Sequence, residues 1–148
     1  MNKAQLIDKY RSTLAGLKEE PHGLVLSAGS ALVIMGIRAS TSMMIGAVTP
    51  SVFKWVANKN KVLKRKHIGV FIQLDFKTRI HEGDEDTGVV CIDGIWCCSP
   101  FELLKQKRHM ASLQNRNPKR LARDREEIKI LQEIVKSNRM TARAITTA

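Results

Sequence analysis

The chain of 148 residues carries 25 lysines and arginines against 14 aspartates and glutamates, a net charge of +11, with 43% hydrophobic and 5% aromatic residues. This length favours one domain, and the composition excludes a wholly disordered chain, a collagen-like repeat and a disulfide-rich scaffold. The three cysteines, Cys91, Cys97 and Cys98, lie in one short stretch without a signal-peptide pattern before them. We therefore expect reduced thiols in a cytoplasmic protein.

The positive charge is unevenly distributed along the sequence. Residues 21–74 contain seven basic residues and no acid, whereas residues 75–100 contain six acids and two bases. Residues 101–148 contain twelve bases and five acids, a surplus of seven. This surplus has two readings, a solvated helical surface or a surface that contacts the phosphates of RNA or DNA.

An apolar stretch raises the question of a membrane span. Between residues 23 and 53 the only charge is Arg38, and residues 24–37 are apolar or small. A spanning helix needs about 20 apolar residues, and extending this stretch through Arg38 places a charge at its middle. Gly29 and Gly36 also interrupt it. We expect no membrane span.

The first half of the sequence predicts helices alternating with short strands. Apolar residues recur at helical spacing over residues 2–17. Proline at the first helical position after Thr49 predicts another helix start. In chain order we expect a helix over 2–17, a strand over 24–26, a turn over 27–30 leading into a helix over 31–37, a buried strand over 41–48 and a helix over 50–58.

The second half predicts strands followed by two helices. Asp93-Gly94 is a strong hairpin-turn signal, and Pro100 and Pro118 each mark a helix start. We expect a basic connector over 59–66, a strand over 68–76 with Ile68, Val70, Ile72, Leu74 and Phe76 facing inward, a charged loop over 81–88, a hairpin of 89–92 with 95–98, and helices over 99–111 and 118–138. These elements predict an α+β fold, a small mixed sheet with packed helices and two C-terminal helices, as one domain over residues 1–138 followed by a flexible basic tail over 139–148.

The stretch from Gly29 to Thr41, GSALVIMGIRAST, resembles the opening motif of small nucleotidyltransferases of the polymerase-β-like superfamily. In that family a Gly-Ser pair starts a short helix, an arginine follows, and a strand with the pattern Ser/Thr-x-Asp-x-Asp comes next. Segments around residues 80–81, 99–105 and 123–131 are also similar to later motifs of the family.

The resemblance implies a nucleotidyltransferase-like fold and a nucleotide site at Gly29, Ser30 and Arg38. Backbone N–H groups at a helix start suit phosphate oxygens, and glycine permits close approach. A purely structural reading stays open, in which Gly29 turns the chain, Ser30 caps the helix and Arg38 satisfies carbonyls at the helix end.

The sequence departs from the family where the resemblance implies carboxylates that hold Mg²⁺. The positions of the aspartate pair are Met43 and Ile45, which offer no ligand to a hard cation, so we expect no metal site there. The position of the third carboxylate holds Arg79. Asp75, expected on the same strand and face as Arg79, is the one remnant candidate for a catalytic carboxylate.

Other candidate sites come from charge and spacing. The cysteines lack the spacing of a zinc site, and the acidic run over residues 82–86 is typical of a solvated turn rather than a calcium loop. Basic residues at the start of the last helix share neighbouring helix positions and are candidates for nucleic-acid binding: Arg116, Lys119, Arg120 and Arg123.

We interpret the chain as a degenerate nucleotidyltransferase-fold protein without catalysis, one that binds nucleotide, RNA or DNA, or a protein partner, and needs no cofactor. Two alternatives stay open. The first is an active, Mg²⁺-dependent nucleotidyltransferase that recruits Asp75 and the acidic run over residues 82–86. The second is an accessory protein that binds nucleic acid through its basic surface alone. Small basic copies of this kind are common in viruses and mobile elements.

Overall fold

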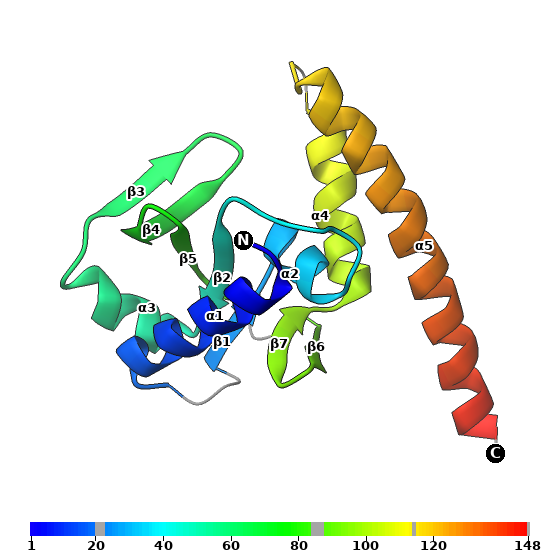
Figure 1. The fold of residues 1–148 in the computed structure, drawn as a ribbon, viewed down its shortest axis with the longest axis horizontal. Coiled ribbons are helices and arrows are strands. Elements are labelled where there is room, and N and C mark those ends of the chain that lie inside the picture. The colour runs from blue at the N-terminus through cyan, green and yellow to red at the C-terminus, as the bar shows by residue number, and fades with distance from the viewer. Residues whose placement is uncertain (20–22, 84–87, 114, 148) are drawn as a thin grey trace. The chain divides into compact units, whose positions relative to one another are not determined.

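The computed structural model describes residues 1–19, 23–83, 88–113 and 115–147. They form two compact units, Met1–Cys98 and Ser99–Ala148 (Figure 1). None of the described helices is both long enough and apolar enough to cross a membrane. The predictions of one domain over residues 1–138 and of a flexible tail over 139–148 stay predictions.

The first unit is a mixed sheet with three helices. The helices are α1 (Lys3–Leu17), α2 (Ala28–Ile34) and α3 (Pro50–Ala57). The strands are β1 (Leu24–Leu26), β2 (Met44–Val48), β3 (Val62–Arg65), β4 (Gly69–Asp75), β5 (Thr78–Glu82), β6 (Val89–Ile92) and β7 (Ile95–Cys98). Their order in the sheet is β3-β4-β5-β2-β1-β7-β6. The pairs β1–β7 and β2–β5 are parallel, and the other pairs are antiparallel.

Helix α1 begins at a capping box that satisfies two backbone donors. The Asn2 side chain accepts a hydrogen bond from Gln5 N–H, and the Gln5 side chain accepts one from Asn2 N–H. The helix ends where Lys18 adopts a left-handed conformation, with φ of 56°. On its buried face the Tyr10 hydroxyl donates to the Leu24 carbonyl oxygen at 2.7 Å, which joins α1 to β1.

The two faces of the central strands differ in burial. On β2, Met44, Gly46 and Val48 are buried, whereas Ile45 and Ala47 are half-buried. Strand β5 repeats this alternation, with Thr78 and Ile80 buried and Arg79 and His81 half-buried. Because side chains alternate between the faces of a strand, β2 and β5 have one buried face and one half-buried face, and the half-buried face carries Arg79 and His81.

The second unit consists of the two predicted C-terminal helices, α4 (Pro100–Ser112) and α5 (Pro118–Thr147), which pack against each other (Figure 1). The Ser99 side chain caps α4 by accepting from Glu102 N–H at 3.3 Å. The Asn117 side chain accepts from Lys119 N–H at 2.9 Å at the start of α5. The α+β prediction, with a small mixed sheet and these two helices, is confirmed.

The structure corrects the expected path through residues 59–76. The basic connector contains the edge strand β3, which pairs with β4 through Val62↔Ile72 and Arg65↔Gly69. Its side chains are mostly exposed, so no apolar alternation marked it as a strand. The expected inward face of the next strand is also wrong, because Phe71 is buried beside Ile72 while Phe76 is 81% exposed.

Other expected bounds shift as well. Helix α2 begins at Ala28, three residues earlier than expected, so Gly29 and Ser30 lie inside its first turn. The expected loop over 81–88 begins too early, since His81 and Glu82 belong to β5; residues 84–87 lie outside the described residues. The backbone of α5 stays helical to Thr147, past the expected end at residue 138.

Candidate functional site

Ser30 ties helix α2 to the first residues of β2. Its hydroxyl oxygen accepts a hydrogen bond from Ile45 N–H at 2.9 Å. As a donor, the hydroxyl has two acceptors within reach: Ser30 Oγ lies 2.9 Å from the Ser27 carbonyl oxygen and 3.1 Å from the Ile45 carbonyl oxygen. The residue is fully buried. The side chain is therefore engaged in holding α2 on the sheet.

Gly29 lies directly beneath the Arg38 side chain. A Cβ atom at Gly29 would collide with Arg38 Nη1 and would lie 3.2 Å from Thr41 Oγ1. The loop after α2 thus brings the Arg38 guanidinium back onto the first turn of that helix. The three residues expected to bind nucleotide, Gly29, Ser30 and Arg38, lie together, and a side chain at position 29 would displace the guanidinium from its place over the helix.

The parallel pairing of β2 with β5 places Ile45 beside Arg79. The register pairs Met44 with Thr78 and Ile45 with Arg79. Residues paired across neighbouring strands lie on the same face, about 4.8 Å apart in the hydrogen-bonding direction. Arg79 therefore lies next to Ile45 on the half-buried face of the sheet, and Met43 directly precedes β2.

Asp75 lies on the opposite side of the sheet from Arg79. The expectation that these two residues share one strand is wrong, because Asp75 ends β4 and Arg79 belongs to β5. The Asp75 carboxylate contacts Lys9 Nζ of α1 at 2.6 Å and Thr78 Oγ1 at 3.2 Å, and it accepts from Lys77 N–H at 2.8 Å. Burial opposes ionisation, but these hydrogen bonds and the charge of Lys9 lower the pKa of Asp75 below its ordinary value.

A cluster that the sequence did not reveal surrounds the ring of Phe71 on the charged face. Arg79 Cζ lies 4.6 Å from the ring centroid, and Arg65 Cζ lies 5.7 Å from it. The His81 ring centroid is 5.9 Å away, and His81 Nδ1 lies 3.1 Å from the Val70 carbonyl oxygen. We call Arg65, Phe71, Arg79 and His81 the Phe71 cluster.

The surroundings of the Phe71 cluster disfavour the protonated, positively charged forms of Arg79 and His81. Burial, and then the positive charge of Arg65, lower the pKa of Arg79. Burial, and then the charge of Arg79, lower the pKa of His81, against the hydrogen bond to Val70. Within the described part of the chain, the buried Nε atom of Arg79 has no hydrogen-bond partner. The registers of β3, β4 and β5 bring these four residues together. Because β3 was not predicted from the sequence, the cluster could not be predicted either.

In the second unit, the basic residues expected to bind nucleic acid separate into two groups. Arg116 Nε donates to Asp124 Oδ2 at 2.9 Å, and Arg123 Nε lies 3.8 Å from Glu127 Oε1. Lys119 and Arg120 are exposed. Of the four, Arg116 is the one mostly withdrawn from solvent, with 13% of its side chain exposed.

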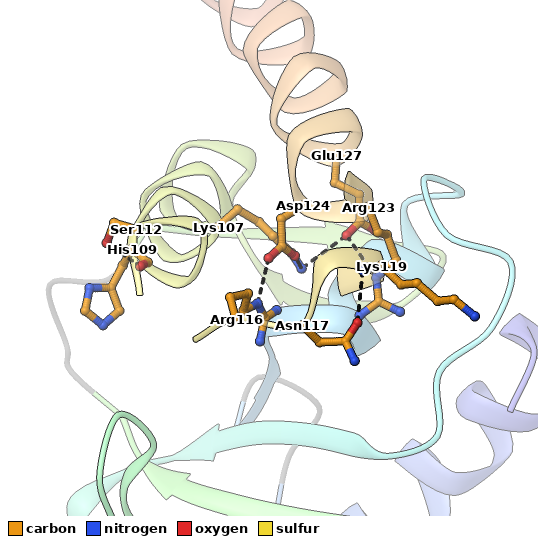
Figure 2. Close-up of polar contacts among 9 residues, drawn as sticks. All are labelled: Lys107, His109, Ser112, Arg116, Asn117, Lys119, Arg123, Asp124 and Glu127. Atoms are coloured by element: carbon orange, nitrogen blue, oxygen red, sulfur yellow. Dashed lines mark hydrogen bonds and ion pairs between the residues drawn. The ribbon is translucent and has the colours of Figure 1, made fainter. Parts of the chain in front are cut away.

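Lys107 completes a buried ion network between α4 and α5 (Figure 2). Its Nζ lies 3.0 Å from Asp124 Oδ1 and 3.1 Å from Glu127 Oε1. Burial opposes ionisation of Asp124, but hydrogen bonds from Arg116 and Lys107 lower its pKa. The sequence signal for Lys107 was its position three and four residues after Leu104 and Leu103, on the buried face of α4.

The described residues contain no group of three His, Cys, Asp or Glu side chains placed to hold a metal ion. The cysteines are free thiols, with Cys91 exposed and Cys97 and Cys98 buried. Burial raises the pKa of Cys97 to about 12, which keeps it protonated and unreactive at neutral pH.

Comparison with known proteins identifies the fold. No protein-family model matches the chain, and no curated protein matches it. The Megavirus polyadenylate synthase superposes with a TM-score of 0.52 and 16% identity, over 88% of this chain and 30% of that chain. The antibiotic-resistance factor ANT(2'')-Ia superposes with a TM-score of 0.52 and 11% identity, over 99% of each chain.

This chain has a nucleotidyltransferase-like fold. The fold expected from the Gly29–Thr41 motif is thereby confirmed. The chain spans 30% of the length of the polyadenylate synthase, and the identity to both proteins is low, so the similarity concerns the fold alone.

The role of Ser30 predicts the effect of removing its hydroxyl. Ser30→Ala leaves the part-buried Ile45 N–H without its acceptor, and we expect the free energy of unfolding to fall by about 1–3 kcal/mol. Urea denaturation measures this loss, which is the same with and without tripolyphosphate. The control Ser12→Ala removes an exposed hydroxyl that bonds within α1, and it should change stability by less than about 0.5 kcal/mol. Equal stability of the two variants would contradict the role assigned to Ser30.

The ion network predicts both a mutational cost and a pH dependence. Asp124→Asn leaves Arg116 and Lys107 with a weakened buried partner, and we expect a loss of about 3 kcal/mol, the lower end for breaking a buried ion pair, because Glu127 still contacts Lys107. The control Glu126→Gln breaks an exposed pair with Lys129 and should cost less than about 1 kcal/mol. Circular dichroism during denaturation measures both.

The pH dependence follows from the lowered pKa of Asp124. Because the folded state holds this pKa down, the stabilisation is fully present above the ordinary aspartate pKa of about 3.9 and is lost as the pH falls through the folded value. The Asp124→Asn variant should therefore lose less stability than the wild type between neutral pH and pH values below about 3.9. Parallel pH profiles would show that the network contributes nothing to acid sensitivity.

Proposed function

We propose that this nucleotidyltransferase-fold chain binds phosphate-bearing ligands, a nucleotide or a nucleic acid strand, and carries out no metal-dependent transfer. The observation that carries the proposal is the pairing of Ile45 with Arg79 on one face of the sheet. Met43, Ile45 and Arg79 occupy the three positions where the resemblance implies carboxylates.

The chemistry of these three side chains disfavours a hard cation. Mg²⁺ requires several oxygen ligands because it gives up its hydration water reluctantly. Met43 supplies a soft thioether, Ile45 supplies no lone pair, and Arg79 supplies a positive charge that repels the ion. The site favours an anion where a transferase needs a metal.

Asp75 is poorly placed to restore a metal site. Its carboxylate contacts Lys9 of α1 and Thr78, whose side chain lies on the face opposite Arg79. Recruiting Asp75 for catalysis would break the ion pair with Lys9 and move the carboxylate to the other side of the sheet. We assign Asp75 a structural role that joins α1 to the β4–β5 turn.

Exposed basic side chains favour phosphate-bearing ligands in both units. On the first unit, residues 59–67 contain six lysines, arginines and histidines and no acid, and apart from Leu63 and Asn60 the residues of this segment are exposed. On the second unit, Lys119 and Arg120 are exposed at the start of α5. Phosphate neutralisation by such residues gives affinity that is independent of base sequence and decreases with salt.

At the start of α2, the Arg38 guanidinium rather than the backbone of Gly29 is the group that a ligand meets. The guanidinium covers Gly29, and the helix has seven residues, so its dipole contributes little. We propose that Arg38 contacts phosphate, with Gly29 and Ser30 holding the helix that supports it. Arginine suits this role because its planar fork matches phosphate oxygens.

The absence of transfer is directly testable. We expect no incorporation of label from ATP, GTP, CTP or UTP into RNA, protein or small hydroxyl acceptors with Mg²⁺ or Mn²⁺, because the residue paired with Ile45 is Arg79 and not a carboxylate. The Asp75→Ala variant serves as the diagnostic control, because we expect removal of the Asp75 carboxylate to lower stability and to leave the absence of transfer unchanged. Metal-dependent incorporation by the wild type that disappears in Asp75→Ala would overturn the proposal and establish the enzyme alternative.

A further inference from the structure

The half-buried face of the sheet carries positive charge and no described carboxylate. Its side chains come from four neighbouring strands, β3, β4, β5 and β2, and their registers align them on one face. They include Arg65, Phe71, Gln73, Arg79 and His81. Asp75, the acid at the β4–β5 turn, lies on the opposite face of the sheet, where its carboxylate contacts Lys9 and Thr78.

The position of the Arg79 guanidinium in the Phe71 cluster is unfavourable in free energy when no anion is bound. Its guanidinium stacks on Phe71, close to Arg65, and its Nε is buried without a described partner. A buried donor without an acceptor costs free energy, and two guanidinium groups on one ring repel each other. An anion between them would satisfy the donor and relieve the repulsion together.

The geometry points to a site in which the Phe71 cluster binds a phosphate group directly through Arg65 and Arg79, without a metal ion. This inference rests on the proposed function and assigns its ligand contact to particular residues. Guanidinium groups bind phosphate through two parallel N–H···O bonds, and the Phe71 ring keeps the planes in place. The phosphate belongs either to a nucleotide or to a nucleic acid backbone, and the experiment distinguishes these sources.

The experiment measures binding of inorganic tripolyphosphate to the intact chain by calorimetry, in EDTA and at fixed low salt. The test variant is Arg79→Met, which keeps the packing against Phe71 and removes the charge. The matched control is Arg11→Gln, which removes an exposed guanidinium from α1, outside both the Phe71 cluster and the basic segment over residues 59–67. We expect Arg79→Met to weaken binding about tenfold or more, as for loss of a charge-assisted hydrogen bond, and the control to weaken it less than about twofold.

A melting curve separates a binding role from a structural one. If Arg79 serves the ligand, Arg79→Met melts at the wild-type temperature or above it, because the orphaned donor and the repulsion from Arg65 disappear. A lower melting temperature with unchanged tripolyphosphate affinity would make Arg79 a structural residue and overturn the inference. Should Arg79→Met fail to fold, the variant Arg65→Gln at the exposed Arg65 is compared with Arg11→Gln in the same way.

Titrations of ATP and of a single-stranded oligonucleotide identify the source of the phosphate. Loss of ATP affinity in Arg79→Met assigns a nucleotide, and loss of oligonucleotide affinity assigns a nucleic acid backbone. Equal affinities of wild type and variant for all three probes, or no tripolyphosphate binding by the wild type, would overturn the inference. Transfer activity would overturn the proposed function alone, because the calorimetric comparison in EDTA does not depend on it.

Discussion

The parallel pairing of β2 with β5 determines what this fold can do chemically. The register places Ile45 beside Arg79. The resemblance to nucleotidyltransferases assigns carboxylates to these positions, and a guanidinium beside an isoleucine reverses the charge of the site. The consequence extends outward from that pair, because Arg79 stacks on Phe71 and brings Arg65 and His81 into one electropositive cluster. We propose that this one register makes a site that repels cations and attracts anions.

The supporting structure keeps this face free of described carboxylates. Asp75, the nearest acid in the adjoining turn, is held by Lys9 on the side of α1, and Ser30 holds the first turn of α2 on β2 through Ile45. In the second unit the opposite arrangement holds, since Lys107 is buried against Asp124 and Glu127, and Arg116 pairs with Asp124. The described residues thus include basic side chains buried in ion pairs, as in the second unit, and basic side chains exposed on the surface, such as Lys119 and Arg120.

The fold was predictable from sequence where local signals were strong. Helix caps, the Asp-Gly turn and the glycine-serine motif located most helices, the β6–β7 hairpin and the nucleotidyltransferase-like architecture. Strand β3 was not predicted because its side chains are mostly exposed. Its pairing with β4 depends on backbone hydrogen bonds, which leave no pattern in the sequence. Missing β3 hid the neighbours of Phe71. The turn at Phe76 and Lys77, which separates β4 from β5, was also missed, so Asp75 and Arg79 were expected on one strand. The role of Lys107 was not predicted because its partners, Asp124 and Glu127, lie on another helix and are distant from it in the sequence.

The measurement that tests the central claim most directly is the affinity of the intact chain for ATP with EDTA compared with its affinity in excess Mg²⁺. In our proposal a site built around Arg79 recognises the negative charge of the ATP phosphates directly. Mg²⁺ bound to ATP neutralises part of that negative charge. The account predicts that ATP binds in EDTA and that Mg²⁺ weakens the binding. ATP binding that requires Mg²⁺, or that strengthens with it, would contradict the account and indicate a working metal site.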